Sequence, residues 1–208
     1  MTSPDLITRA FAVVDASLRQ YFPNDFHSRC MYASLGLAAL LEDAGIYAQM
    51  VGGDFACAVV EKGGNRKGFH GFGLSANGAP THFWVRTQDL LLDLGPTYLP
   101  HTSTLPLSKL PVVRWNLENP LPNYFGYSEQ LRYSRDVQLS DATLQQRSDD
   151  FRTFCRKNAL SLGVNFSLKS WELNSHVSLV SAAQRGDRWA KEMLLFLKSG
   201  DKARLPTR

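Results

Sequence analysis

Residues 29–51 read RCMYASLGLAALLEDAGIYAQMV, and this stretch decides the fold. From about Cys30 onward the side chains are apolar or small on nearly every side until Glu42 and Asp43, which predicts a buried helix. Gly45 is placed to end that helix, because glycine adopts the left-handed conformation of a C-terminal cap without steric cost.

Strands are expected after this helix, because the hydrophobic period changes to two. Residues 47–51 and 55–60 predict two strands separated by a flexible turn at 52–54. Further along, THFWV at 81–85 and the apolar run at 89–93 predict two more strands. A buried helix followed by sheet indicates an α+β fold.

The Asn77-Gly78 dipeptide is the strongest hairpin signal in the chain. It predicts that the strand holding His70 pairs with the strand holding His82, after a polar loop at residues 61–68. We therefore expect the middle of the chain to form an antiparallel sheet.

The flanking segments complete a single domain over residues 1–208, with a core at about 1–100, a Pro-rich wrapping loop at about 100–138 and a helical part at about 139–208. The prolines between residues 99 and 123 allow at most one edge strand, at about 112–115. The remaining expected elements are a helix over 4–20 capped near Ser3, a helix from Ser140 or Asp141 to Leu162 stopped by Gly163, and a helix pair at 176–185 and 187–198 that presents Trp189, Met193, Phe196 and Leu197 on one face.

Composition narrows the classes of function. The chain is 44% hydrophobic and 20% charged, with a net charge of +4, which is typical of a globular protein and too weakly basic for a nucleic-acid surface. No apolar stretch is long enough to span a bilayer, and the N-terminus lacks the pattern of a signal peptide, so we expect a cytoplasmic protein. Three scattered cysteines without a CxxC pair argue against a disulfide framework or a structural zinc site, and we expect no cofactor.

Cys30 is the candidate nucleophile. It lies at the expected start of the buried helix, where the helix dipole favours the thiolate, which is the reactive form of cysteine. A small apolar residue on a core helix is the competing interpretation. Cys57, in an apolar strand, and Cys155, on an amphipathic helix stripe, are most simply core residues.

His82 and Asp93 strengthen the catalytic interpretation. Asp93 is an acid inside an apolar run, where burial is costly unless the carboxylate has a partner. If Thr87-Gln88 is a two-residue turn, His82 lies directly opposite Asp93 and the two side chains meet. A slip of one residue would put them on opposite faces. A nucleophile at a helix start, a base on a strand and an acid on the next strand are the roles of a catalytic triad.

Other candidates are weaker. His70 is a possible rival base, and His27 is placed to line the site or cap the helix. Trp84 and Tyr98 are candidates for a pocket, but aromatic core packing is the simpler explanation of both. A metal site built from His70, His82 and Asp93 has no HxH or HExxH spacing to support it.

Three segments resemble the transglutaminase-like branch of the papain-like superfamily, which includes transglutaminases, bacterial transglutaminase-like proteases and arylamine N-acetyltransferases. They are RCMYASLGLAALLEDAGIYAQMV, THFWV and LLLDLGPTYL, in the family order Cys, His, Asp, and they cover about a third of the chain. The resemblance implies Cys30 as nucleophile, His82 as general base and then acid, and Asp93 as the orienting carboxylate. The step from His82 to Asp93 is short for the family, and the Pro-rich and C-terminal parts match no member.

The oxyanion donors are less defined. The backbone N–H of Cys30 is a natural donor at the helix start. Asn24 matches the offset at which papain-like proteases place a glutamine donor, and Gln20 is also nearby.

The expected activity is acyl transfer at an amide-type bond of a peptide, a protein or a small amide or acyl substrate, with hydrolysis and transfer both open. Two alternatives are an inactive binding module that keeps the fold, and a toxin or effector that uses the same triad.

Overall fold

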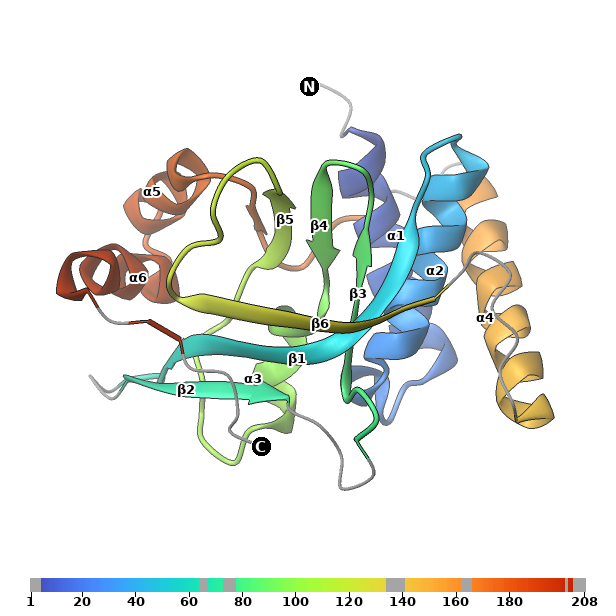
Figure 1. The fold of residues 1–208 in the computed structure, drawn as a ribbon, viewed down its shortest axis with the longest axis horizontal. Helices are drawn as coiled ribbons and strands as arrows, with labels where there is room; N and C mark the ends of the chain where they lie inside the picture. The colour runs from blue at the N-terminus through green and yellow to red at the C-terminus, as the bar shows by residue number, and fades with distance from the viewer. Residues whose placement is uncertain are drawn as a thin grey trace.

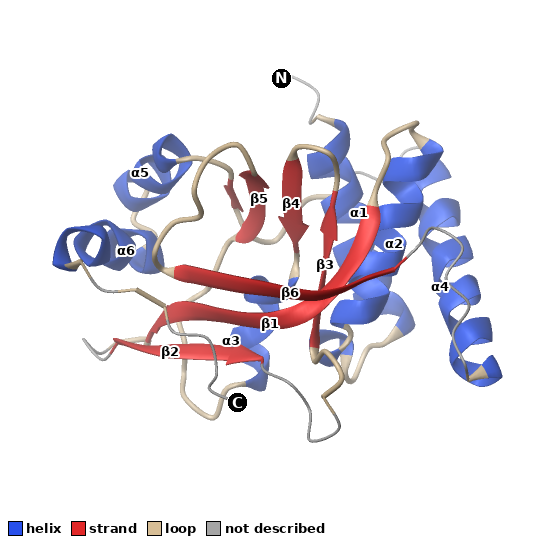
Figure 2. Cartoon of the chain, in the orientation of Figure 1, coloured by secondary structure: helices blue, strands red, loops and turns tan. Residues whose placement is uncertain are grey.

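The computed structural model describes residues 5–63, 67–72, 78–133, 141–161, 166–200 and 202–203. These residues form a mixed α+β fold, in which helices pack around a strongly curled β-sheet (Figures 1 and 2). The elements are α1 Leu6–Tyr21, the 3-10 helix η1 Phe26–Ser28, α2 Cys30–Asp43, β1 Gln49–Val60, β2 Lys67–Phe72, β3 His82–Arg86, β4 Leu90–Asp93, η2 Gly95–Tyr98, α3 Leu99–Thr102, β5 Val112–Asn116, β6 Phe125–Tyr133, α4 Ala142–Leu160, β7 Glu172–Leu173, α5 His176–Gln184 and α6 Arg188–Ser199.

The sheet has the strand order β2-β1-β3-β4-β5-β7, and β6 pairs with the other edge of β1. All pairs are antiparallel except β5 with β7, so the sheet is mixed. In Figure 1, β1 and β6 run across the view, whereas β3, β4 and β5 run nearly perpendicular to them. This curl turns one face of the sheet into an enclosed interior.

The predicted hairpin between β2 and β3 is wrong. β3 pairs with residues 49–53 of β1, and β2 pairs with residues 55–60, so β2 and β3 follow each other along one edge of β1. Both are antiparallel to β1 and therefore point the same way, which a hairpin cannot achieve. Asn77 itself lies outside the described residues.

The predicted turn at residues 52–54 is also wrong, because β1 continues through it. The pairing of β1 with β6 shifts register between Gly52 and Gly53, which is where a β-bulge absorbs the irregularity. A Cβ on Gly53 would lie 2.1 Å from the carbonyl oxygen of Ser128, so the strands approach here only because residue 53 is glycine.

The prediction of a wrapping loop over residues 100–138 is wrong, because the described part of this segment contains the strands β5 and β6. The prediction of an edge strand is also wrong, because β5 lies between β4 and β7. Pro111 directly precedes β5 and Pro122 lies just before β6, so the prolines bound the strands where no ladder N–H is needed.

The helices largely follow the sequence. Gly45 ends α2 with φ of 80°: its N–H bonds to the carbonyl of Glu42, and Ile46 bonds back to Leu41, a Schellman motif. Asp5 caps α1 by accepting a hydrogen bond from the Thr8 backbone at 3.0 Å, whereas the predicted cap, Ser3, lies outside the described residues.

The cap of α4 is Asp141, one of the two residues predicted, which accepts from the Leu144 backbone at 2.9 Å. The helix pair at the C-terminal end is confirmed as α5 and α6, although β7 precedes it unpredicted. Ser140, Leu162 and Gly163 lie outside the described residues.

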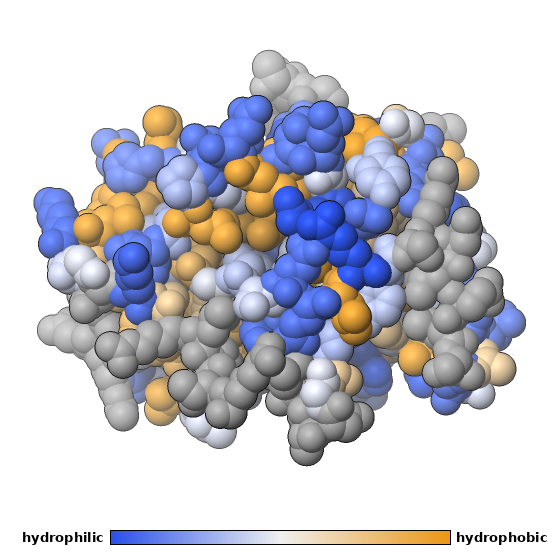
Figure 3. Space-filling view, viewed as in Figure 1, coloured by the Kyte–Doolittle hydropathy of each residue, from blue (hydrophilic) through white to orange (hydrophobic). Residues whose placement is uncertain are grey.

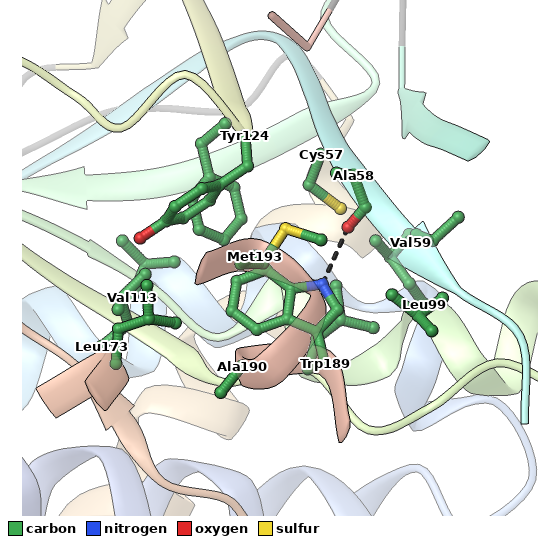
Figure 4. Packing of buried hydrophobic residues seen from close by; sticks show 14 of the residues in the cluster. Cys57, Ala58, Val59, Leu99, Val113, Tyr124, Leu173, Trp189, Ala190 and Met193 are labelled. Carbon is green, nitrogen blue, oxygen red and sulfur yellow. Dashed lines mark hydrogen bonds between the residues drawn. The ribbon is translucent and has the colours of Figure 1, made fainter. Parts of the chain in front are cut away.

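Two apolar clusters pack on the two faces of the sheet. One fills the curled interior and includes Trp84, and α5 and α6 close it. Figure 4 shows part of this cluster, where Trp189 of α6 packs against Met193 and donates a hydrogen bond from Nε1 to the carbonyl oxygen of Ala58 at 2.8 Å. The other cluster joins α1, α2 and α4 to the outer face of β3, β4 and β5, with Val85 and Leu92 as sheet members.

The outer surface over β6 is polar. Glu129 accepts hydrogen bonds from Arg86 and Arg132, and strongly hydrophilic side chains gather over the middle of the face in Figure 3. No helix among the described residues is long and apolar enough to cross a membrane.

We expect Trp189→Ala to lower the free energy of unfolding by ~3–5 kcal/mol, because it empties a fully buried site and leaves the carbonyl of Ala58 without its partner. Urea denaturation followed by circular dichroism measures the change. Leu195→Ala on the same helix is the control, since that side chain is 54% exposed and its loss should cost at most about 0.5 kcal/mol. Equal losses in both variants would contradict the assignment of α6 as the closure of the interior.

Candidate active site

Cys30 is the first residue of α2, directly after the turn formed by η1. The residue is half-buried, and its Sγ lies 3.7 Å from the carbonyl oxygen of Thr81, the residue before β3. The N-cap residue, Arg29, provides no side-chain hydrogen bond to the helix. The backbone N–H groups of the first turn therefore keep their positive partial charge directed toward the region of the thiol.

His82 and Asp93 form the predicted pair. His82 Nε2 lies 2.7 Å from Asp93 Oδ2, and the two residues are 0% and 2% exposed. The predicted register is shifted by two residues, because Gln88 and Asp89 form the turn and Thr87 donates its N–H to the carbonyl of Leu90. Because a shift of two residues keeps each side chain on its face of the sheet, His82 and Asp93 still meet.

Gly95 makes room for this pair. A Cβ on Gly95 would lie 2.2 Å from His82 Cε1, so the imidazole rests against a backbone position that no larger residue can occupy. The N–H of Gly95 also donates to Asp93 Oδ1 at 2.7 Å, which gives the second carboxylate oxygen a partner. Gly95 therefore shapes the site both through its missing side chain and through its backbone N–H.

Tyr127 is a member of the site that the sequence did not reveal. Its hydroxyl donates to Asp93 Oδ2 at 2.8 Å, across 34 residues of sequence. It comes from β6, in the segment predicted as loop, and only the pairing of β6 with β1 brings it to the interior. The one available signal was the alternation of Phe125 and Tyr127 with small and polar residues.

The imidazole of His82 is surrounded by aromatic rings. Phe72 stacks on it with ring centroids 5.3 Å apart and planes 10° apart, and Phe55 lies at 4.8 Å. Trp84 and Tyr127 follow at 5.9 and 6.5 Å. Aromatic faces are electron-rich, so this enclosure is compatible with a positively charged ring.

Burial opposes the charge on His82, but the Asp93 carboxylate, through its charge and its hydrogen bond, and the adjacent Cys30 side chain together raise the pKa of His82 to about 10. At neutral pH the ring is therefore an imidazolium. Its Nδ1 is buried and makes no hydrogen bond to the described residues, which leaves that nitrogen for the Cys30 side. An imidazolium beside a thiol favours the thiolate.

The other two cysteines are core residues, as predicted. Burial raises the pKa of Cys57 well above its usual value, with the charge of Asp93 adding to the effect, and burial raises the pKa of Cys155 to about 12. Neither of these two thiols forms a reactive thiolate at neutral pH.

The two side chains predicted as oxyanion donors, Gln20 and Asn24, are both exposed. Gln20 is exposed on α1 and accepts a hydrogen bond from Asn158 of α4 at 3.2 Å. Asn24 is exposed in the turn after α1. The backbone N–H of Cys30 remains the donor that the helix start provides.

The three residues predicted to line a pocket lie in two different places. Trp84 lies beside His82 but is 2% exposed and belongs to the core. Tyr98 is buried and donates its hydroxyl to Asp15 at 3.0 Å, and the ring of His27 stacks on that of His101 with centroids 6.1 Å apart. Tyr98 and His27 thus belong to a second group of side chains next to the site.

His70 is not opposite His82. It lies on β2, paired with Cys57 of β1, and burial lowers its pKa. In the part of the chain that the structure describes, no group of three or more His, Cys, Asp or Glu side chains is arranged to hold a metal ion. Asp93 forms its hydrogen bonds with His82, Tyr127 and the Gly95 backbone.

Comparison of the chain with protein-family models, with curated proteins and with solved structures found no match.

We expect the His82 ring to stay protonated through neutral pH and to lose its proton near pH 10. Because this pKa is raised above the unfolded value of about 6.5, the pair contributes its full stability below pH ~6.5 and loses it as the pH rises toward 10. NMR titration of the His82 ring resonances, with urea unfolding across the same range, measures both effects. In Asp93→Asn the attraction is removed while burial remains, so the pKa should fall below its ordinary value. A wild-type ring that titrates near 6.5 would contradict the charged pair.

Gly95→Ala should displace the His82 ring, because the added methyl group has no space at 2.2 Å from Cε1. We expect a loss of stability of ~1–3 kcal/mol, typical of overpacking, and a changed His82 NMR signal. Gly68→Ala on β2 is the matched control, since its nearest neighbour would be an ordinary 4.0 Å away. An unchanged His82 signal in Gly95→Ala would refute this packing.

Proposed function

We propose that this chain is a cysteine-nucleophile acyl-transfer enzyme of the transglutaminase-like branch of the papain-like superfamily, acting on an amide-type bond. One observation carries the proposal: a buried hydrogen bond of 2.7 Å between His82 and Asp93, with Cys30 at the start of α2 close enough to His82 to help raise the pKa of its ring. The roles of nucleophile, acid-base and orienting carboxylate each have a residue.

The reaction begins from the thiolate and the imidazolium. Sγ of Cys30 attacks the substrate carbonyl carbon, and the C=O electron pair moves to the oxygen. As the C–N bond breaks, His82 gives its proton to the departing amine, and a thioester on Cys30 remains. Water or an acceptor amine then attacks the thioester, His82 takes the proton from it, and the thiolate leaves.

The oxyanion forms next to the first turn of α2. The backbone N–H of Cys30 has no intrahelical acceptor, since the first four N–H groups of a helix lack one. Such a preorganised donor typically contributes ~3–4 kcal/mol to the stabilisation of an acyl-transfer transition state.

Asp93 and Tyr127 act through His82. The carboxylate fixes the ring by binding Nε2, so that Nδ1 is the nitrogen left for the thiol. Tyr127 and the N–H of Gly95 hold the carboxylate in turn. Because both donors favour the charged carboxylate, they also favour the charged imidazolium.

The rate of Cys30 alkylation by iodoacetamide, measured against pH and located by mass spectrometry, tests the proposal. At pH 6 an ordinary thiol, with a pKa of about 8.5, is nearly all protonated and reacts slowly. We expect wild-type Cys30 to react at least about tenfold faster than an ordinary thiol at pH 6, and His82→Ala to abolish the excess.

His70→Ala is the matched control, because it removes a half-buried imidazole from the neighbouring strand without touching the pair. Asp93→Asn provides a second variant that retains the volume of the site should His82→Ala unfold. Alkylation that rises only near pH 8.5, regardless of His82 and Asp93, would reject the enzyme and favour a binding module built on the same fold.

A further inference from the structure

A small cavity is lined in part by the segment that follows Asp93. Its volume is about 230 Å³, smaller than the ~300–1,000 Å³ of sites for drug-sized ligands. It is formed by α1, by η2 and α3, and by two stretches of loop at 109–110 and 168–170. The lining residues are Asp15, Arg19, Leu94, Thr97, Pro100, His101, Lys109, Leu110, Leu168, Lys169 and Ser170.

The cavity is positively charged. Arg19, Lys109 and Lys169 line it, and Asp15 is the carboxylate among the lining residues. Asp15 is already bound by Arg19 and by the hydroxyl of Tyr98. Among the described residues, Lys109 and Lys169 make no ion pair, so two positive charges at one small cavity have no partner in the protein.

Arg19 is oriented before any ligand arrives. Its Nε donates to both oxygens of Asp15, at 3.0 and 3.1 Å, and its guanidinium lies 4.2 Å from the ring centroid of Phe26. Tyr98 fixes Asp15 from the other side at 3.0 Å. The two Nη groups make no hydrogen bond to the described residues, which leaves a planar pair of donors suited to a carboxylate or phosphate.

The remaining wall of the cavity is apolar. Leu168 and Pro100 line it with half-buried side chains, and Leu94 and Leu110 lie behind them in the packed core. An inorganic anion would use the cations and leave this wall unused. A small molecule with a charged head and a short apolar body would use both.

We propose that this cavity binds a small organic acid, whose carboxylate or phosphate head is held by Arg19, Lys109 and Lys169 and whose apolar body packs on Leu168 and Pro100. The site is separate from the Cys30, His82 and Asp93 group and does not depend on its activity. Burial and the nearby positive charges of Arg19 and His27 lower the pKa of His101, which agrees with an excess of positive charge at this cavity.

Titration of the ¹⁵N-labelled full chain at pH 7 and constant ionic strength tests the site, with hexanoate and hexyl phosphate as probes. Hexanamide is the neutral match, and inorganic phosphate is the anion without an apolar body. We expect saturable shifts at Thr97, His101 and Ser170 with at least one of the two amphiphilic anions, and the stronger of them identifies the head group. Hexanamide and inorganic phosphate should each bind at least about tenfold more weakly, or ~1.4 kcal/mol.

The double variant Lys109→Gln/Lys169→Gln should weaken the binding of the preferred probe about tenfold or more. Lys157→Gln/Lys198→Gln removes the same charge elsewhere and should leave binding unchanged. Arg19→Lys should weaken it as well, because lysine lacks the planar donor pair. No saturable shift with either anion, equal binding of hexanamide, equal binding of inorganic phosphate, or an unaffected double lysine variant would each overturn the proposal. Cys30 alkylation should be unchanged in the double lysine variant, so failure here is distinguishable from failure of the triad.

Discussion

Asp93 is a carboxylate almost without access to water, and an ionised group in such a place is stable only when charge and hydrogen bonds replace its hydration. Three donors do so: the imidazolium of His82, the hydroxyl of Tyr127 and the backbone N–H of Gly95. Each donor comes from a different part of the chain, so the carboxylate is satisfied only when β3, β4 and β6 have all reached their places. The hydrogen bonding of Asp93 therefore depends on the correct pairing of these strands.

The curl of the sheet brings the donors of Asp93 together. β1 carries β3 on one edge and β6 on the other, and this arrangement brings Tyr127 over the same interior that His82 and Asp93 face. Phe55, Phe72 and Trp84 then exclude water from the imidazole. In that enclosure the attraction between His82 and Asp93 is weakly screened, which keeps the ring charged although burial opposes it.

The elements that depend on local sequence patterns could be predicted from the sequence. The buried helix, its end at Gly45, the strands of His82 and Asp93 and the paired helices at the C-terminal end all follow from periodicity and capping, and the structure confirms them. The His82–Asp93 contact was predicted through a register that was off by two, and it held because the strand period is two. What could not be predicted depends on long-range pairing. β2 was assigned to the wrong neighbour, β6 was hidden among prolines, and Tyr127 was missed because nothing near it in sequence marks its partner.

We propose that Cys30 and His82 form a working acyl-transfer pair held by Asp93. Intact-protein mass spectrometry after brief exposure to p-nitrophenyl acetate at pH 7 is a direct test of this pair. We expect one acetyl group, located on Cys30 by peptide mapping, that forms quickly in the wild type, decays as the thioester is resolved, and forms slowly in His82→Ala and Asp93→Asn. Acetylation scattered over lysines, or a Cys30 acetyl group that forms equally fast in the wild type and in both variants, would contradict it.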